Sequence, residues 1–456
     1  MADPQVLGAA WQQVVNRTPV LRSTVVWEGV DEPVQVVHRR VEVPVVYHDW
    51  TALPSADRDH KLQRILAADR ATGFDLAAAP LLRVQVAQLS DTEVQLVWTF
   101  HHVLLDGWSV HQVLSDVFAY HAALTHHTNP QLPHRRPFRD YLAWLREQDQ
   151  TEAAEYWRCV LQGFECRTPL PFEQAPTQAY SSSSSHWLSA ELNKVDSGRL
   201  SEFAQRHGLT LNAVVQGAWA LLLSRYSGES DVCFGATMSD RPAELPGVED
   251  ITGIFINTLP VRLDVNSETG VIAWLRELQT TQAESRRFGF VSLAQLHTLS
   301  ELPAGGQLFD SILVFENYPI NDEEGAAHGI RVRELQALET TNYPLTVVVS
   351  ARRELSVEFG YDADAFDAAM IERMSAHFLR LLTVLAADPR VRCGDIDILT
   401  EEQRSQVLVE WNDTDRDVPV ATLAELVQAA AARTPAAPAV VFEGGVLDFA
   451  ELDARA

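Results

Sequence analysis

Apolar residues along the first part of the chain recur at spacings that alternate between those of a helix and those of a strand. Segment 6–15 carries an apolar stripe at helical spacing, and segment 110–124 carries a second. Segment 20–27 is predicted to be a strand, and the clearest strand spans 94–102. The side chains of that strand divide between two faces, with Leu96, Trp98, Phe100 and His102 on one and Gln95, Val97, Thr99 and His101 on the other.

Residues 168–185 differ in composition and separate two patterned regions. They contain three prolines and a run of serines without a clean period, which is typical of a linker. Beyond them the mixture of helix and strand patterns returns, so we predict two lobes, 1–167 and 186–398, of mixed α/β (α+β) class. The expected helices of the second lobe are 211–223, 271–282 and 369–386, and its expected strands are 232–237, 311–315 and 345–350.

The pattern changes again after Ile398. Residues 399–416 form a charged connector, and residues 417–456 carry the patterns of a helix, two short strands and the start of another helix. A unit of that length has too few apolar positions to close a core. We therefore expect 417–456 to be the opening part of a further domain.

Composition narrows the class of partner. The 456 residues include 62 acidic and 36 basic side chains, which gives a net charge of -26. This balance argues against nucleic acid or an anionic membrane as a partner, because both attract clustered Lys and Arg. The four cysteines have no Cys-x-x-Cys spacing, and no apolar run approaches the roughly 20 residues of a membrane span. We expect a cytoplasmic protein with reduced thiols and no metal site.

The candidate chemistry lies where the clearest strand leads into a helix, in His-His-Val-Leu-Leu-Asp-Gly at 101–107. Adjacent strand residues point to opposite faces, so His101 and His102 cannot serve one site in the same way. A neutral imidazole, with a pKa of about 6.5, suits removal of a proton from an attacking amine. Gly107 allows close approach of the backbone, and its amide at a helix start can face a developing oxyanion. Asp106 is better suited to anchoring the turn than to acting as a second base.

Two adjacent histidines are by themselves more often structural than catalytic, but other segments fall into order around them. Together they resemble the condensation domains of nonribosomal peptide synthetases, over about residues 1–398. The family's first motif is absent, because its pattern begins before Met1, and residues 417–456 look like the start of an adenylation domain. The matching segments are Asn16–Ser23, His101–Gly107 with Trp108 and Ser109, Phe138–Tyr141 with Trp144, Ile251–Arg262, Phe309–Ser311, Phe315–Pro319 and Asn342–Leu345.

This resemblance implies a fold and a reaction. The fold is two lobes like chloramphenicol acetyltransferase, arranged as a V around a central tunnel. The reaction is attack by the amine of a downstream carrier-bound aminoacyl group on an upstream acyl or peptidyl thioester. The implied cofactor is phosphopantetheine, carried on the partner domains and not bound directly. The implied partners are the upstream and downstream peptidyl carrier domains and the adjoining adenylation domain.

The resemblance also assigns roles by position. His102 becomes the catalytic or substrate-positioning base, with His101 as its structural neighbour. Asp106 pairs with Arg22 in a salt bridge, and Gly107 lines the place where the thioester is attacked. The residues assigned to the tunnel or substrate are Trp108, Ser109, Asn257, Ser311 and Asn317; for the last three, a role as buried hydrogen-bonding residues is equally open.

Two other functions stay open for this fold. An epimerisation domain shares the double-His motif but also needs a Glu-Gly-His-Gly-Arg motif in the second lobe, which the chain lacks. A noncatalytic recruitment platform usually has an eroded motif, whereas His102, Asp106 and Gly107 are intact here. Ester formation would use the same residues as amide formation, and the sequence does not separate the two reactions.

Overall fold

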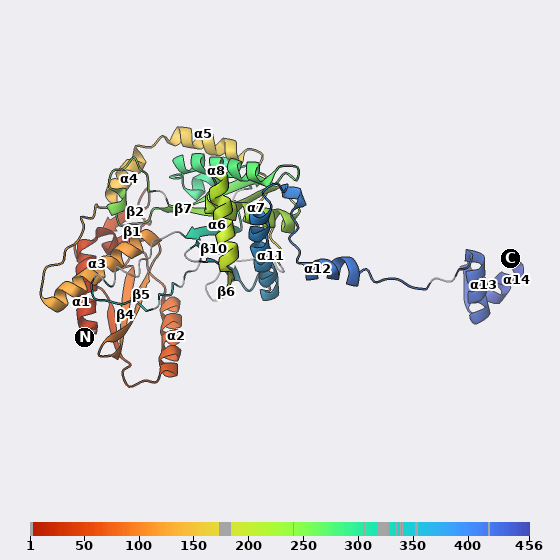
Figure 1. Cartoon of the computed structure of the whole chain (residues 1–456), viewed down its shortest axis with the longest axis horizontal. Helices are drawn as coiled ribbons and strands as arrows, with labels where there is room; N and C mark the ends of the chain where they lie inside the picture. The colour runs from red at the N-terminus through yellow and green to blue at the C-terminus, as the bar shows by residue number, and fades with distance from the viewer. Residues whose placement is uncertain are drawn as a thin grey trace. The chain divides into compact units, whose positions relative to one another are not determined.

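The computed structural model divides the chain into two compact units, Met1–Ile398 and Leu399–Ala456 (Figure 1). It describes the chain except for residues 1–2, 173–183, 240, 304–305, 317–325, 327, 334, 338, 340, 352–353 and 418–419. In this described part, no helix has both the length and the apolar character needed to cross a membrane.

The N-terminal part of the first unit is built on a three-stranded sheet. β4 lies in the middle, parallel to β3 and antiparallel to β5. Helices α1 and α3 cover it, and the core between them includes Trp11, Val14, Leu82 and Val117. The elements of this part are α1 (Pro4–Arg17), β1 (Ser23–Val26), β2 (Val34–Val37), β3 (Val45–Asp49), α2 (Ser55–Thr72), β4 (Leu82–Ser90), β5 (Glu93–Phe100), α3 (Gly107–His126), α4 (Arg139–Arg146) and α5 (Gln150–Leu161).

The C-terminal part of the first unit is built on a six-stranded sheet of order β6-β11-β10-β9-β7-β8. β9 runs parallel to both of its neighbours, and the other pairs are antiparallel. Its elements are β6 (Ser185–Leu192), α6 (Lys194–His207), α7 (Leu211–Ser227), β7 (Asp231–Ser239), β8 (Ile256–Asp264), α8 (Val271–Arg287), α9 (Leu293–Leu299), β9 (Ser311–Glu316), β10 (Leu345–Ala351), β11 (Leu355–Asp362) and α11 (Ala368–Ala387).

The two faces of this sheet pack against different helices. Successive strand residues point to opposite faces, and accordingly Leu313 belongs to the core under α6, α7, α8 and α11. Its neighbour Ile312 belongs to a second core, with Trp157 of α5 and Leu296 of α9. Helix α5, which follows the N-terminal part in sequence, therefore packs on the C-terminal sheet.

The mixed α/β class predicted from the sequence is confirmed by these alternating elements. Two predicted boundaries are wrong. Residues Pro19–Arg22 form a 3-10 turn, so the expected strand at 20–27 begins only at Ser23. The expected strand at 94–102 ends at Phe100, because the chain turns there and the Leu104 amide donates to the His101 carbonyl at 3.1 Å. Most of the expected linker, residues 173–183, lies outside the described residues.

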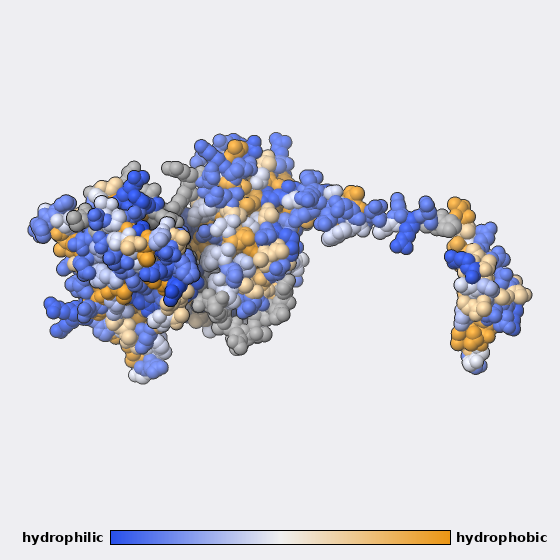
Figure 2. Space-filling model, turned by 90° about the horizontal axis from the view of Figure 1, so that it is seen from below, coloured by the Kyte–Doolittle hydropathy of each residue, from blue (hydrophilic) through white to orange (hydrophobic). Residues whose placement is uncertain are grey.

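The second unit contains α12 (Glu401–Ser405), α13 (Leu423–Arg433), β12 (Pro438–Phe442), β13 (Gly445–Asp448) and α14 (Phe449–Arg455). β12 and β13 form a hairpin whose turn residues Glu443 and Gly444 both have positive φ, as a type I′ turn requires. Among its described residues, Ala431 is the one buried hydrophobic side chain. Hydrophobic residues lie at the surface of this unit (Figure 2), and Val441 and Phe442 of the hairpin are 70% exposed.

Candidate functional site

The double-His motif occupies the loop between β5 and α3. The His101 amide donates to the Leu81 carbonyl at 2.9 Å, which joins the start of the loop to the strand next to β5. Leu104 and Leu105 are buried in the core beneath the loop. Because the middle of the loop is anchored in this way, the residues on either side of these leucines have fixed positions.

His101 serves the loop itself. The Val103 amide donates to its Nδ1 at 3.1 Å, so the proton of the neutral ring is carried by Nε2. The ring lies perpendicular to that of Phe74, with 6.3 Å between ring centroids. Burial, and to a lesser degree the neighbouring His102, lowers the pKa of His101. A neutral, half-buried imidazole that accepts a backbone hydrogen bond fits the structural role implied for this residue.

His102 lies in the turn and is exposed to solvent. The expectation that the two imidazoles point to opposite faces of a strand does not apply, because the strand has already ended at Phe100. The two rings instead differ in solvent exposure, because the turn buries part of His101 and leaves His102 accessible. That His102 is the catalytic or substrate-positioning base stays a prediction.

Asp106 is buried and receives hydrogen bonds from three directions. Its carboxylate accepts from the Ser109 amide at 2.8 Å, which caps α3, and from the Phe255 amide at 3.1 Å. Arg241 Nη2 lies 3.1 Å from both carboxylate oxygens. The exposed fractions of the two side chains are 1% for Asp106 and 12% for Arg241. This is therefore a buried, charge-assisted pair.

The predicted salt bridge between Asp106 and Arg22 is wrong. Arg22 lies in the 3-10 turn, where its Nε donates to the Val15 carbonyl at 3.0 Å and its Nη1 donates to the carbonyls of His38 and Arg39. The guanidinium thus holds α1 and the segment after β2 together. Arg241, which follows β7, forms the pair with Asp106.

A second segment docks on the start of α3 through Ser109. The Ser109 hydroxyl donates to the Gly253 carbonyl at 2.7 Å and accepts from the Gly253 amide at 3.0 Å and from Arg241 Nη2 at 3.0 Å. The indole of Trp108 donates to the Glu249 carbonyl at 3.2 Å. Ser109 and Trp108, expected near the tunnel or substrate, thus bond to the backbone of residues 249–253.

The remaining predicted site residues have different surroundings. Asn257 in β8 donates to the carbonyls of Gly289 and Val291 at 2.7 and 2.8 Å, so its amide holds the loop before α9. Ser311 is buried at the first position of β9. Gly107 is the first residue of α3, and the role of its amide stays a prediction. Asn317 lies outside the described residues.

Sequence reasoning missed Arg241, and the chain offers no local signal for it. The residue is 135 positions from Asp106, in a segment without a helical or strand period. Its Nη1 donates to the Val248 and Ile251 carbonyls, and its guanidinium lies 4.0 Å from the centre of the Phe255 ring. Groups of His, Cys, Asp and Glu that could hold a metal ion are not found among the described residues.

The model of the condensation domain family matches residues 1–408. The chain belongs to the condensation-domain family. The chain is 40% identical over 449 residues to a component of the linear gramicidin synthase of Brevibacillus parabrevis, covering 98% of this chain and 9% of that protein. It is 32% identical over 462 residues to bacitracin synthase 3 of Bacillus licheniformis, covering 99% and 7%. This condensation domain thus spans less than a tenth of these relatives.

Solved structures share the fold of the condensation domain. The X-domain from teicoplanin biosynthesis has a TM-score of 0.72 and 25% identity, covering 87% of this chain and 90% of that one. The starter condensation domain of rhizomide synthetase has a TM-score of 0.72 and 18% identity, covering 88% and 90%. The fold is therefore shared by proteins of quite different sequence.

Proposed function

We propose that the chain forms a peptide bond between two carrier-bound substrates, as the acyltransferase of a nonribosomal peptide synthetase. The observation that carries this proposal is the contrast within the motif loop. Asp106 is buried and bonded to two other segments, whereas His102, four residues away, is exposed. A loop held rigidly around one accessible imidazole is what positioned acid–base chemistry requires.

The reaction assigns a role to each part of the loop. The imidazole of His102 takes a proton from the attacking amine or orients that amine, and the Gly107 amide faces the oxyanion that develops on the thioester carbonyl. The phosphopantetheine arm arrives with a partner carrier domain and is part of the substrate. Upstream and downstream carriers, and an adenylation domain beginning within 417–456, complete the proposed assembly.

The test is amide formation by the chain, with loaded donor and acceptor carriers and mass spectrometry of the acceptor. We expect His102→Ala to keep the fold, because the side chain is exposed, and to slow the reaction about 10²–10⁴-fold. His126→Ala is the matched control, because His126 is an exposed histidine at the other end of α3. Full activity of a folded His102→Ala protein would contradict the assignment.

A second variant, His102→Gln, separates the two versions of the His102 role. If His102 is the base, His102→Gln is as slow as His102→Ala, because an amide group does not accept the proton of the amine. If His102 only orients the amine, the amide group restores part of the rate. Inversion of an aminoacyl centre without transfer would indicate an epimerisation domain, and binding of a partner protein without either reaction would indicate a recruitment platform.

A further inference from the structure

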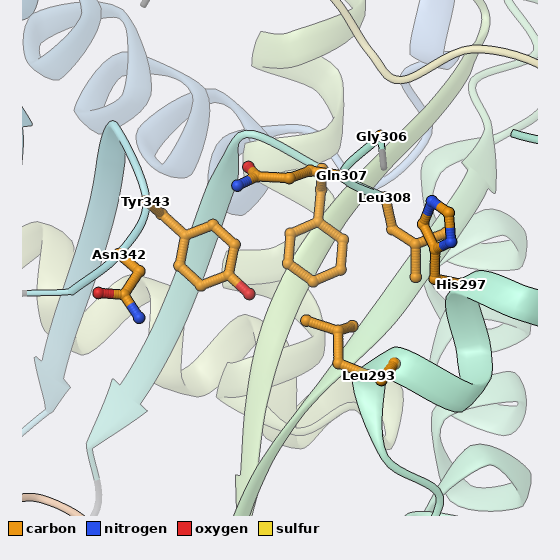
Figure 3. A pocket seen from close by; sticks show the side chains of 9 residues that line it. Leu293, His297, Gly306, Gln307, Leu308, Asn342 and Tyr343 are labelled. Atoms are coloured by element: carbon orange, nitrogen blue, oxygen red, sulfur yellow. The ribbon is translucent and has the colours of Figure 1, made fainter. Parts of the chain in front are cut away.

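A cavity of about 470 Å³ opens on the α9 side of the C-terminal sheet (Figure 3). Three segments that are distant in sequence form its walls: the start of α9, residues 306–309 just before β9, and residues 342–343 just before β10. The last two overlap two of the matching sequence segments, Phe309–Ser311 and Asn342–Leu345. The roles proposed for the motif loop do not involve these segments. Small-molecule sites usually have volumes of about 300–1,000 Å³.

Most of the cavity wall is apolar, and part of it is rigid. Leu293, Leu308 and Phe309 contribute apolar side chains. The Phe309 ring is fully buried and occupies the space that a side chain at Gly235 would fill, because a Cβ there would lie 2.3 Å from Phe309 Cε2. Tyr343 stacks on Phe309 at 5.4 Å with 29° between the rings. The wall therefore exists before any ligand enters.

Two polar groups at the cavity have no hydrogen-bond partner in the described part of the chain. The Tyr343 hydroxyl points toward the side where Leu293 lies (Figure 3). Burial raises the pKa of Tyr343, so its hydroxyl stays protonated and can donate. The second group is His297 Nε2, which is buried without a partner. Buried polar atoms are usually satisfied, so an orphan nitrogen beside a cavity favours a ligand that brings a polar atom.

The cavity is linked to the motif loop through β8. The Phe255 amide, just before β8, donates to Asp106, and two residues later Asn257 donates to the Val291 carbonyl. Val291 lies two residues before Leu293, the first residue of α9 and part of the cavity wall. Because strand residues rise by about 3.3 Å each, the two anchor points on this backbone are separated by roughly 7 Å.

We propose that this cavity receives a large, mainly apolar side chain with one hydrogen-bonding group, such as that of tyrosine, from a carrier-bound substrate. The apolar wall would bury the body of the side chain, and Tyr343 would bond its polar group. The inference rests on the proposed function only for the source of the side chain. Binding itself can be measured without turnover.

The binding test uses pantetheine linked to tyrosine, phenylalanine or glycine, with NH in place of the thioester sulfur, and calorimetry on the full chain. We expect the tyrosyl compound to bind at least about 10-fold more tightly than the glycyl compound, because it buries more apolar surface. Leu293→Trp should remove this difference by filling the cavity. Thr298→Trp, at an exposed position of the same helix, is the control and should keep it.

A second variant tests the polar contact without filling the cavity. Tyr343→Phe keeps the ring that stacks on Phe309 and removes only the hydroxyl. It should weaken binding of the tyrosyl compound about 2–10-fold, the usual worth of one hydrogen bond, and leave the phenylalanyl compound unchanged. Equal binding of all three compounds to the wild-type protein, or a Leu293→Trp variant that discriminates like wild type, would overturn the proposal.

Condensation assays identify the source of the side chain. The three aminoacyl groups are placed first on the donor carrier and then on the acceptor carrier, and the series whose rates change in Leu293→Trp marks the substrate that occupies the cavity. Discrimination in binding without any amide product would contradict the proposed function and leave the cavity assignment standing. Amide formation with no side-chain dependence in either series would support the proposed function and contradict the cavity assignment.

Discussion

Two adjacent histidines in one loop have opposite surroundings, and this difference has consequences that can be measured. His101 is half-buried and accepts a hydrogen bond from its own loop, whereas His102 is exposed. Burial lowers the pKa of His101. Protonation of His101 would place a charge in a partly buried ring and would break the bond from the Val103 amide, because a protonated ring offers no acceptor.

The stability of the chain should therefore depend on pH through His101. The folded pKa is lowered, so below the unfolded value of about 6.5 the unfolded chain binds the proton more readily than the folded one. The stabilising contribution is complete above about pH 6.5 and is lost as the pH falls through the folded pKa. His101→Asn keeps an acceptor for the Val103 amide without titrating. Between about pH 7.5 and 5.5 the melting temperature should fall more for wild type than for His101→Asn; equal falls would contradict the assignment.

Asp106 should matter for folding before it matters for chemistry. Asp106→Asn keeps an acceptor for the Ser109 amide but removes the negative charge that pairs with the buried Arg241 side chain. Removing one partner of a buried pair costs about 3–5 kcal/mol. Asp140→Asn is the control, since Asp140 pairs with Arg136 at 2.9 Å with both side chains 30% exposed, and half-exposed pairs contribute about 0–1 kcal/mol. Denaturant unfolding of both variants measures the difference, and similar midpoints would count against a buried pair.

At the scale of elements, the motif loop depends on how closely residues 251–255 approach α3. Gly253, in this segment, lies directly against the Phe138 ring, because a Cβ on it would lie 2.1 Å from Phe138 Cδ2. Its carbonyl accepts from the Asp106 amide at 3.2 Å and from the Ser109 hydroxyl. The lack of a side chain therefore lets residue 253 pack on the Phe138 ring while its backbone bonds to the start of α3.

Two glycine-to-alanine changes should have opposite effects. Gly253→Ala should force the segment and the Phe138 ring apart, and so lower both the melting temperature and the rate of amide formation. Gly198→Ala should raise stability by up to about 1 kcal/mol, because this residue is exposed inside α6 and a Cβ there meets nothing within 4 Å. Thermal unfolding of the two variants checks the signs. A Gly253→Ala protein as stable and active as wild type would show that the segment can shift without consequence.

The elements that were predicted correctly are those with a clear apolar period. Helix α7 begins after Thr210, whose hydroxyl accepts from the Ala213 amide at 3.1 Å, as expected of a cap. Helix α2, by contrast, has one buried residue, the polar Asp69, so no apolar stripe could indicate it. The 3-10 turn Pro19–Arg22 was missed because Val20 and Leu21 are apolar, as in a strand, and are buried in the turn as well.

The site was predictable only as far as it is local. The motif marks the end of β5, the start of α3 and Asp106 as the cap of that helix. The ion pair with Arg241 and the bonds to Gly253 arise from tertiary packing, which brings together residues 135 and 144 positions apart. No spacing rule connects such residues, so neither the identity of the partner of Asp106 nor the docking of the second segment could be read from one sequence.

For the whole molecule, the two units differ in how much apolar surface they bury. Residues up to Ile398 contain large cores around both sheets, whereas the described residues beyond it bury one hydrophobic side chain. In the second unit Leu423, Val441 and Phe442 are 80%, 70% and 70% exposed. So little burial cannot offset the entropy of ordering the unit.

Limited proteolysis should therefore trim the chain from its C-terminal side. We expect cleavage within 399–456 first, leaving a product that ends near Ile398 and keeps the melting temperature of the intact chain. Mass spectrometry of the products and thermal unfolding of the trimmed protein measure both quantities. Resistance of 399–456 to a protease that already cleaves the first unit would show that the second unit is stable by itself.

The separation of Asp106 from its partners also bears on the timing of synthesis. Asp106 and Phe255 are 149 residues apart. At about 5–20 residues per second, a ribosome needs roughly 7–30 s to travel from one to the other. Throughout that interval the nascent chain carries the motif but not the complete segment that docks on α3. The motif loop thus gains its contacts with residues 241–255 late during translation, after a delay set by chain length and not by the composition of the loop.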